Sequence, residues 1–412
     1  MGILLYSLAN FGFGAFYALN NFILPPWIEH YVKSAAIRAI LSDSHSFEGA
    51  LIQPVIGAWS DRLRSRFGRR RPFLLVCVPI SVAFILATPI TAHLPDHVRL
   101  AAMIACIMLF TIAFNIAADP YQALLADITT QDQRDKVSGL WYFIGVLGQV
   151  GILLIPAPLP MRFVIVALTM LVTTLITCVT TLEPPPPAMA HVEGGLKQHY
   201  ADLMRAMQGL STLRQARFYL GMYFLFGAGI GAIQPHLSLF IVKIGGCTPE
   251  TALHVVMALF LTAAVAAVPG GLLAAKIGVK HMLVVGTTLI GIASLGGMWV
   301  HSLPQIVGVL VIAGLGMAAQ NSSSFPLMTR LVPTEEVGYY SGLQTTALCI
   351  ALPGSAVGTG WLIDHSSYRV IFAMCFVCIV LSAAVLSQIR EGEADTEIAA
   401  RRVELAREAV IG

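Results

Sequence analysis

The sequence predicts an all-α membrane protein with twelve transmembrane helices in two pseudo-symmetric halves of six helices. Three observations support this prediction: the composition, the spacing of the apolar segments and a repeat between the halves. Hydrophobic residues make up 57% of the 412 residues and charged residues only 11%, and the mean hydropathy is +0.77. Soluble domains carry about 25% charged residues, so most of this chain is expected to face lipid.

The apolar segments are long enough to cross a bilayer, which takes roughly 20 helical residues. The first segment is interpreted as a span, because it is too long for the apolar core of a signal peptide and no charged segment precedes it. The expected spans are 2–25, 38–60, 73–92, 98–122, 137–158, 162–182, 217–243, 249–274, 281–300, 304–328, 337–362 and 369–389.

The basic residues predict the orientation of these spans. Of the 25 Lys and Arg residues, 19 fall on the side that holds both termini and the central connection. The positive-inside rule therefore places both termini in the cytoplasm, in a protein of the plasma (inner) membrane. The net charge of +3 is small and no basic, aromatic patch accompanies it, so nucleic acid is not an expected partner.

A proline-rich segment divides the chain, because Glu183 is followed by four prolines that cannot continue a helix. We expect an N-terminal six-helix half over 1–182, a cytoplasmic linker over 183–216 and a C-terminal six-helix half over 217–389. The cytoplasmic tail, 390–412, has mixed charges and is interpreted as a solvated helix.

The two halves share a pattern of glycine, a short spacer, a turn and basic residues. It occurs over 57–71 after the second span and over 271–280 after the eighth. A second match relates 120–140 to 326–343, about half the chain apart. Two related six-span halves are typical of secondary transporters, whose substrate site lies near the midplane between the halves.

The first copy of this pattern also predicts a cytoplasmic latch. Gly57 would let another helix pack closely, and Asp61 could pair with an arginine or with a facing helix N-terminus. The alternative is that the basic residues only anchor the topology. The expected latch residues are Gly57, Asp61, Arg62, Gly68, Arg69, Arg70 and Arg71.

The segment 53–73, which reads QPVIGAWSDR and then SRFGRRRPF, closely resembles the signature of the sucrose/proton symporters. This branch of the major facilitator superfamily is related to the glycoside–pentoside–hexuronide:cation symporters. The sequence ALLAD at 123–127 is similar to the same group. The resemblance implies the twelve-helix fold of the superfamily and uptake of a sugar, a disaccharide or glucoside, with a proton by alternating access.

The sequence departs from the family pattern at three positions. Thr111 replaces an aspartate of the plant carriers in the fourth span, and Gln122 replaces an arginine. Gln53 replaces the cation-binding aspartate of the melibiose-type carriers. Coupling to a proton or another cation must therefore use a different group or be absent.

Charged groups inside the bilayer are costly and are functional candidates for that reason. Glu48 lies about 20 Å from the cytoplasmic end of the second span at 1.5 Å per residue, where a carboxyl could exchange a proton between gate states. His45 is one turn away, and Asp43 is near. Asp119, at the inner end of the fourth span, is the fourth candidate. Alternatively, the second span begins after Glu48, and Glu48, His45 and Asp43 only line its water-exposed entrance.

Sugar sites combine aromatic faces with amides or acids that bind hydroxyl groups. Side chains of these types in the spans predict a polar cavity, although each could instead be an interhelical contact or an interfacial anchor. The substrate-binding candidates are Asn10, Phe13, Tyr17, Asn20, Asn21, Gln53, Asn115, Gln122, Trp141, Tyr142, Gln149, Tyr223, Gln234, His236, Gln320, Asn321 and Gln344.

Two other functions fit the same fold: export or flipping of an amphiphilic small molecule or lipid, and a membrane sensor or assembly factor that transports nothing. The sequence has no HExxH, GxSxG or P-loop motif, so an enzyme is not expected. All cysteines but Cys247 fall inside apolar segments, and the CxxC formed by Cys375 and Cys378 lies in mid-span with no partner pair, so neither a metal nor a cofactor is expected. The expected partners are a small solute, which the resemblance implies is a sugar, a proton or other cation, and the lipid bilayer.

Overall fold

A computed structural model describes residues 2–46, 48, 49, 52, 56, 59, 60, 63, 65–128, 131–181, 183, 209–333 and 337–411. The regular structure of these residues is helical, and they contain no β-strand. The predicted all-α class is therefore confirmed.

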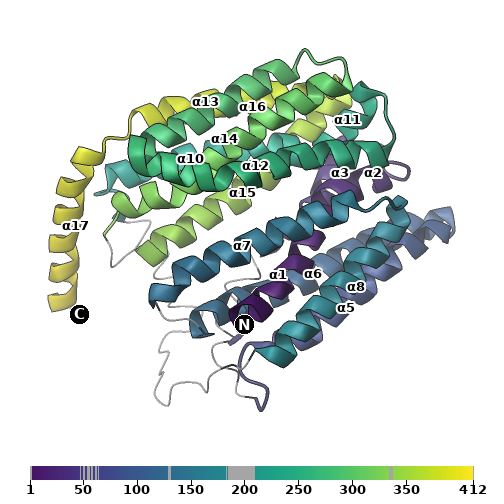
Figure 1. Ribbon diagram of the computed structural model, residues 1–412, viewed down its shortest axis with the longest axis horizontal. Coiled ribbons are helices and arrows are strands. Elements are labelled where there is room, and N and C mark those ends of the chain that lie inside the picture. The colour runs from purple at the N-terminus through teal and green to yellow at the C-terminus, as the bar shows by residue number, and fades with distance from the viewer. Residues whose placement is uncertain are drawn as a thin grey trace. The chain divides into compact units, whose positions relative to one another are not determined.

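The helices before the linker follow the expected order of spans (Figure 1). They are α1 (Gly2–Ala18), the π-helical turn η1 (Leu19–Ile23), α2 (Leu24–Ile28), α3 (Ala35–Ser42), α5 (Arg71–Ile90), η2 (Thr91–His93), α6 (Asp96–Ile128), α7 (Gln131–Leu154) and α8 (Leu159–Thr180).

The helices after the linker follow the same pattern. They are α10 (Arg214–Ile233), the 3₁₀ turn η3 (Gln234–His236), α11 (Leu237–Gly245), α12 (Pro249–Ile277), α13 (Val279–Gly297), α14 (Leu303–Arg330), α15 (Val337–His365), α16 (Val370–Ser387) and α17 (Glu391–Ile411).

Nine helices in the described part of the chain are long and apolar enough to cross a membrane, and each lies in one of the expected spans. The first expected span is divided, because α1 ends at Ala18 and η1 separates it from α2, which contains Pro25 and Pro26. Much of the second lies outside the described residues. The fifth lies in α7, of which Phe143–Leu154 is the apolar stretch found among the described residues.

The chain divides into two compact units. The first contains Met1–Leu196 together with Pro235–Met257, and the second contains Lys197–Gln234 with Ala258–Gly412. Residues Pro235–Met257 follow the linker in sequence, yet they pack with the helices that precede it.

The first unit is held together by close helix packing. Helix α1 packs on α7 and α8, and α5 packs on α6 and α8. A Cβ atom added to Gly14 would lie 1.9 Å from the carbonyl oxygen of Gly145, and one added to Gly148 would lie 2.0 Å from that of Phe11. Only glycine lets the two backbones come this close, which is how membrane helices gain contact area.

In the second unit, α10 packs on α15 and α16, and α13 packs on α14 and α16. Its main core cluster also holds Ile389, just before α17, and Ala394 in the first turns of α17, both of which are fully buried. The Glu397 carboxylate accepts a hydrogen bond from the Gln215 backbone N–H at 2.9 Å, which satisfies a free donor in the first turn of α10. The prediction of a solvated tail helix is therefore wrong for its first turns.

We predict that Gly148→Ala weakens the α1–α7 contact. The added methyl group meets backbone rather than a movable side chain, so the free energy of unfolding should fall by about 2 kcal/mol or more. Thermal unfolding of the detergent-purified protein measures this effect.

Gly308→Ala in α14 is the matched control, because a Cβ atom there has no neighbour within 4 Å. Its melting temperature should match or exceed that of the wild type, since alanine favours helix. Equal melting temperatures for the two variants would contradict the packing argument.

Candidate transport site and gate

Three acidic or basic candidates of the second expected span are buried in the first unit. Asp43 is 6% exposed, His45 8% and Glu48 9%. They follow α3, whose first turn is capped by the Ser34 hydroxyl. Side chains this buried do not fit the alternative in which the three residues only line the water-exposed entrance of the second span.

His45 is held from two sides by asparagines. The Asn20 amide nitrogen lies 2.9 Å from His45 Nδ1, and the Asn115 amide donates to the His45 carbonyl at 2.9 Å. The Ser46 hydroxyl lies 3.4 Å from His45 Nε2 and donates to Asp43 Oδ1 at 2.8 Å. Asn20 and Asn115, expected as substrate contacts, thus connect η1 and α6 to the His45 segment.

Glu48 has the least compensated charge in this group. Both carboxylate oxygens are buried, and neither has a hydrogen-bond partner among the described residues. The carboxyl faces the hydroxyl of Thr111, but that hydroxyl donates to the carbonyls of Ile107 and Met108 at 2.9 and 3.0 Å. Glu48 therefore lies beside the position where the plant carriers have an aspartate in the fourth span.

The fourth candidate, Asp119, lies half-buried in α6 next to Pro120, and it has an interaction partner. Helix α6 continues through Pro120 to Ile128. Nearby, the Tyr121 hydroxyl donates to the Tyr6 carbonyl at 2.9 Å, and the Tyr6 hydroxyl donates to the Tyr121 carbonyl at 2.7 Å. This reciprocal pair ties α6 to α1.

Of the remaining candidates in the first unit, some pack against neighbouring helices and others are partly or fully exposed. The Asn10 amide donates to the Trp141 carbonyl at 2.7 Å, and the Phe13 ring packs edge-on against Phe114 at 4.9 Å. The Tyr17 ring lies 5.5 Å from that of His45. Asn21 is buried, Gln149 is half-buried and Gln122 is exposed, whereas Gln53 and the side chain of Tyr142 lie outside the description.

In the second unit, α10 carries a stack of aromatic rings, and α14 and α15 carry glutamine side chains with unpaired polar atoms. Tyr219, Tyr223 and Phe226 of α10 stack in sequence, with ring centroids 5.9 and 6.1 Å apart. Gln320 of α14 is 1% exposed, and neither atom of its amide group has a partner in the described structure. Gln344 of α15 faces the Tyr223 hydroxyl, and its Oε1 atom is likewise unpartnered there.

The other candidates from this half of the sequence have fewer unpaired polar atoms with which to bind a ligand. His236 is buried and Asn321 lies on α14, and both have interaction partners. Gln234 is half-buried at the start of η3. Gln320 and Gln344 are thus the amides that retain unpaired polar atoms in the described residues of this half.

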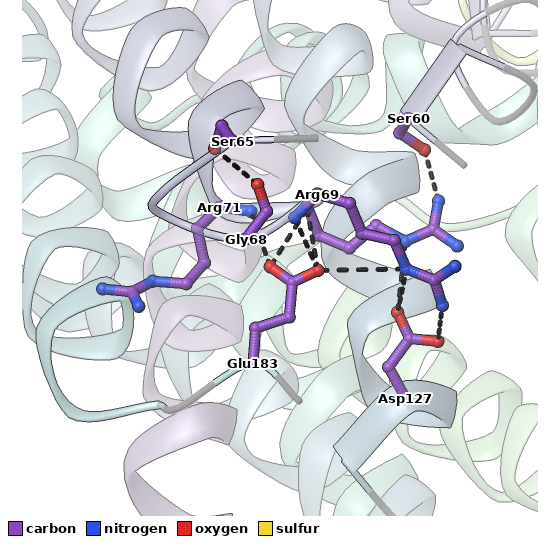
Figure 2. A network of polar contacts seen from close by, with 8 residues as sticks. Ser60, Ser65, Gly68, Arg69, Arg71, Asp127 and Glu183 are labelled. Carbon is purple, nitrogen blue, oxygen red and sulfur yellow. Dashed lines mark hydrogen bonds and ion pairs between the residues drawn. The ribbon is translucent and has the colours of Figure 1, made fainter. Parts of the chain in front are cut away.

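Figure 2 shows the charge network at the start of α5, in which two carboxylates hold the Gly68–Arg71 turn. Arg69 Nη2 lies 2.6 Å from Asp127 Oδ1, and Arg70 Nε lies 3.2 Å from Asp127 Oδ2. Arg70 also donates to the Ser60 hydroxyl. Helix α6 is thereby joined to the loop before α5.

Glu183 caps the N-terminus of α5. Its carboxylate accepts from the backbone N–H groups of Arg69, Arg70 and Arg71 at 2.9–3.4 Å, where the helix dipole favours a negative charge. Gly68 has φ +97°, and a Cβ atom there would lie 2.1 Å from Glu183 Oε2. Glycine is therefore required at this position by both conformation and space.

The structure brings Gly68, Arg69, Arg70 and Arg71 together, while Gly57, Asp61 and Arg62 lie outside the described residues. Sequence reasoning did not assign Asp127 and Glu183 to the latch. The sequence does contain a feature that could have identified them, because each is a carboxylate at the end of a span on the side that carries the arginines.

The comparisons with known proteins agree with this architecture. The family model of the Major Facilitator Superfamily matches residues 6–253 and 219–409, so the chain belongs to that superfamily. It is therefore a membrane transport protein and not an enzyme.

Among its relatives, the sucrose transport protein SUC3 of Arabidopsis thaliana is 34% identical over 152 residues, which are 32% of this chain and 26% of the plant protein. The membrane-associated transporter protein of Homo sapiens is 33% identical over 165 residues, 37% of this chain and 31% of the human protein. The alignments thus span less than a third of either relative.

Two solved structures share the fold across nearly the whole chain. The nucleoside transporter NupG has a TM-score of 0.75 at 12% identity, and the match covers 94% of this chain and 99% of that one. The D-xylose-proton symporter has a TM-score of 0.68 at 13% identity, with 95% and 98% covered.

We predict that Gly68→Ala destabilises the protein partly through Glu183. The positive φ alone should cost about 1–2 kcal/mol of unfolding free energy, and the clash with the carboxylate adds to it. In a Glu183→Ser background the clash disappears, so Gly68→Ala should cost at least about 0.5 kcal/mol less. Thermal or denaturant unfolding of the four proteins measures this coupling.

Gly246→Ala is the control, because Gly246 has φ +63° and open space around its Cβ position. Its effect should be the same with and without Glu183→Ser. Additive effects of Gly68→Ala and Glu183→Ser would show that Glu183 does not occupy the space beside the turn.

Proposed function

We propose that this chain is a secondary active transporter that takes up a sugar, a disaccharide or glucoside, together with a proton. Transport proceeds by alternating access across the plasma (inner) membrane, with both termini in the cytoplasm. The observation that carries the proposal is the buried Glu48 carboxyl without a partner among the described residues. The names of the plant relatives and of the xylose symporter support a sugar as the cargo.

A proton is the coupling ion that best suits Glu48. An ionised carboxylate in the bilayer without a cationic partner costs several kcal/mol, whereas binding a proton removes the charge. No group of three metal-ligating side chains occurs in the part of the chain that the structure describes. A carboxyl that is neutral when closed off from water and ionised when open to it couples proton binding to the gate state.

The position of Glu48 accounts for the departure at Thr111. In this chain the fourth span offers a hydroxyl where the plant carriers offer an acid, and Glu48 brings its carboxyl to the same place from the second span.

The second unit supports a sugar as the cargo. Amides suit the hydroxyl groups of a sugar. Both amide atoms of Gln320 and the Oε1 atom of Gln344 lack, among the described residues, the hydrogen bonds that buried polar groups normally have. A sugar hydroxyl would satisfy them, whereas the alkyl part of an amphiphile would not.

We predict that Glu48→Gln abolishes proton-driven accumulation. Glutamine keeps the size and polarity of the side chain but cannot release a proton, so exchange of sugar should persist without a response to the gradient. Uptake of external labelled sucrose or maltose into proteoliposomes, with and without an inward proton gradient, measures accumulation, and the same uptake into proteoliposomes loaded with the unlabelled sugar measures exchange.

Asp96→Asn is the matched control, because Asp96 is an exposed carboxylate in the first turn of α6. It should leave the gradient response unchanged. An unaltered response in Glu48→Gln would remove Glu48 from the coupling mechanism, and absence of uptake of any sugar by the wild type would contradict the proposed cargo.

We predict that Gln320→Leu weakens sugar binding by about tenfold to a hundredfold. Losing one or two hydrogen bonds to a sugar hydroxyl corresponds to about 1.5–3 kcal/mol of binding free energy. A thermal-shift titration with the sugar that stabilises the wild type most measures the change in affinity.

Gln305→Leu on the same helix is the control, because Gln305 accepts a hydrogen bond from the His301 backbone at the start of α14. Its sugar affinity should remain that of the wild type. Equal affinities for Gln320→Leu and the wild type would exclude Gln320 from the sugar site.

A further inference from the structure

The residues after α3 form a buried polar cluster that the proposed coupling at Glu48 does not use. Helix α3 ends at Ser42, Asp43 makes a bend with φ −107° and ψ 12°, and the chain is helical again over 44–46. The Ser46 backbone N–H donates to the Asp43 carbonyl at 3.1 Å. This bend brings the side chains of Asp43, His45 and Ser46 together within one turn.

The cluster is linked from the imidazole to the carboxylate. The Ser46 hydroxyl donates to Asp43 Oδ1 at 2.8 Å, and its oxygen lies 3.4 Å from His45 Nε2. Because this hydroxyl gives its own proton to the carboxylate, it can only accept from the ring, so Nε2 carries a proton directed at Ser46. One serine thus connects the imidazole to the carboxylate in a fixed direction.

Asn20 holds the other nitrogen of the ring. It lies in the π-helical turn η1, and its amide nitrogen lies 2.9 Å from His45 Nδ1. Because an amide nitrogen only donates, Nδ1 accepts, which agrees with a proton on Nε2. The two contacts come from different elements of the fold, and both select the same neutral tautomer of His45.

The Asn20 amide also has one atom in reserve. Its Oδ1 atom is buried and has no hydrogen-bond partner among the described residues. A half-turn of the amide group would exchange its two ends, so that Oδ1 faces His45 Nδ1 and accepts a hydrogen bond from it. Since buried polar atoms are normally paired, an amide with one unpaired end suits a ring nitrogen that gains and loses a proton.

A protonated His45 would have a carboxylate to balance its charge on the far side of Ser46. Asp43 is 6% exposed, and its second oxygen, Oδ2, has no partner among the described residues. From a neighbouring element, the rings of Phe16 and Tyr17 in α1 lie 6.4 and 5.5 Å from that of His45, and both are uncharged at neutral pH. Asp43 is therefore the charged group that these contacts link to His45.

We propose that His45 is a proton-transfer residue that passes protons to Glu48. Asp43, Ser46 and Asn20 are its positioning residues. His45 lies three residues nearer than Glu48 to the start of the second expected span, so a proton that enters at that end meets His45 first. This inference rests on the proposed role of Glu48 in coupling, and it adds the route by which a proton reaches that carboxyl.

The transfer moves one proton in two steps. First, Nδ1 of the neutral ring takes a proton from the water at the open surface, and the Asn20 amide turns so that its oxygen accepts from the new N–H. The resulting imidazolium is balanced by Asp43 across Ser46. Second, Nδ1 gives this proton to the Glu48 carboxylate, and the amide turns back. The proton on Nε2 stays in place throughout, so the ring returns to its original tautomer.

Nitrogen NMR of the purified protein with isotope-labelled histidine tests the ring without any transport, and His45→Gln identifies the His45 signals. The wild type should show the neutral tautomer with its proton on Nε2 at neutral pH. Asn20→Asp places a carboxylate at Nδ1 and should convert the ring to the imidazolium. A wild-type proton on Nδ1, or a ring that is unchanged in Asn20→Asp, would overturn the role of Asn20.

Transport rates test the route itself. Ser46→Ala disconnects His45 from Asp43 but leaves both residues and Glu48 in place. Uptake of labelled sucrose or maltose driven by an inward proton gradient should slow about tenfold in proteoliposomes, because proton delivery then limits the cycle. Exchange of labelled for unlabelled sugar needs no net proton movement and should keep the wild-type rate. Ser46→Thr retains the hydroxyl and should restore uptake.

Ser81→Ala in α5 is the matched control, because it removes a buried hydroxyl that donates to the Phe110 carbonyl at 2.8 Å. It should leave both rates unchanged. Wild-type uptake in Ser46→Ala would overturn the proposal, and so would an equal loss of uptake and exchange, which indicates a purely structural serine. A gradient response that persists in Glu48→Gln would instead contradict the proposed function.

Discussion

In the low dielectric of the bilayer, an ionisable side chain must either pair with an opposite charge or become neutral. The charged residues of this structure follow that constraint. At the start of α5, Asp127 forms ion pairs with Arg69 and Arg70, while Glu183 faces the positive end of the helix. The buried guanidinium of Arg162 is surrounded by carbonyl groups. Glu48 lacks such compensation among the described residues, which is why it stands out as a functional group.

The same constraint separates structural amides from candidate binding amides. Asn10 and Asn115 direct their amides at backbone carbonyls of neighbouring segments, and so they hold the first unit in shape. Asn20 pairs its amide nitrogen with His45, but its Oδ1 atom has no partner among the described residues. Gln320 and Gln344 retain unpaired atoms in the described structure, although both are in the interior of their helices. Since buried polar groups are normally satisfied, the unpaired amides are the ones that have capacity for a ligand.

Both ends of the first unit carry charges, but the charges are arranged differently. At the Gly68–Arg71 turn, Glu183 is buried and Asp127 is partly buried, and each carboxylate contacts several donors, which favours a strong and well-defined junction. At α11, the ion pair of Lys243 with Glu29 is single and partly exposed, and such pairs contribute little to stability.

The sequence alone determined the all-α membrane class and the approximate positions of the nine long apolar helices found in the described residues, because lipid imposes local rules that apolar length reveals directly. It also pointed to Glu48, since a charge in an apolar segment is visible without a fold. Only the tertiary structure decided which groups meet: Glu183 reaches Arg69 across 114 positions, and Lys243 reaches Glu29 across the linker. Such partners are set by how helices pack, and no spacing within the sequence encodes that geometry.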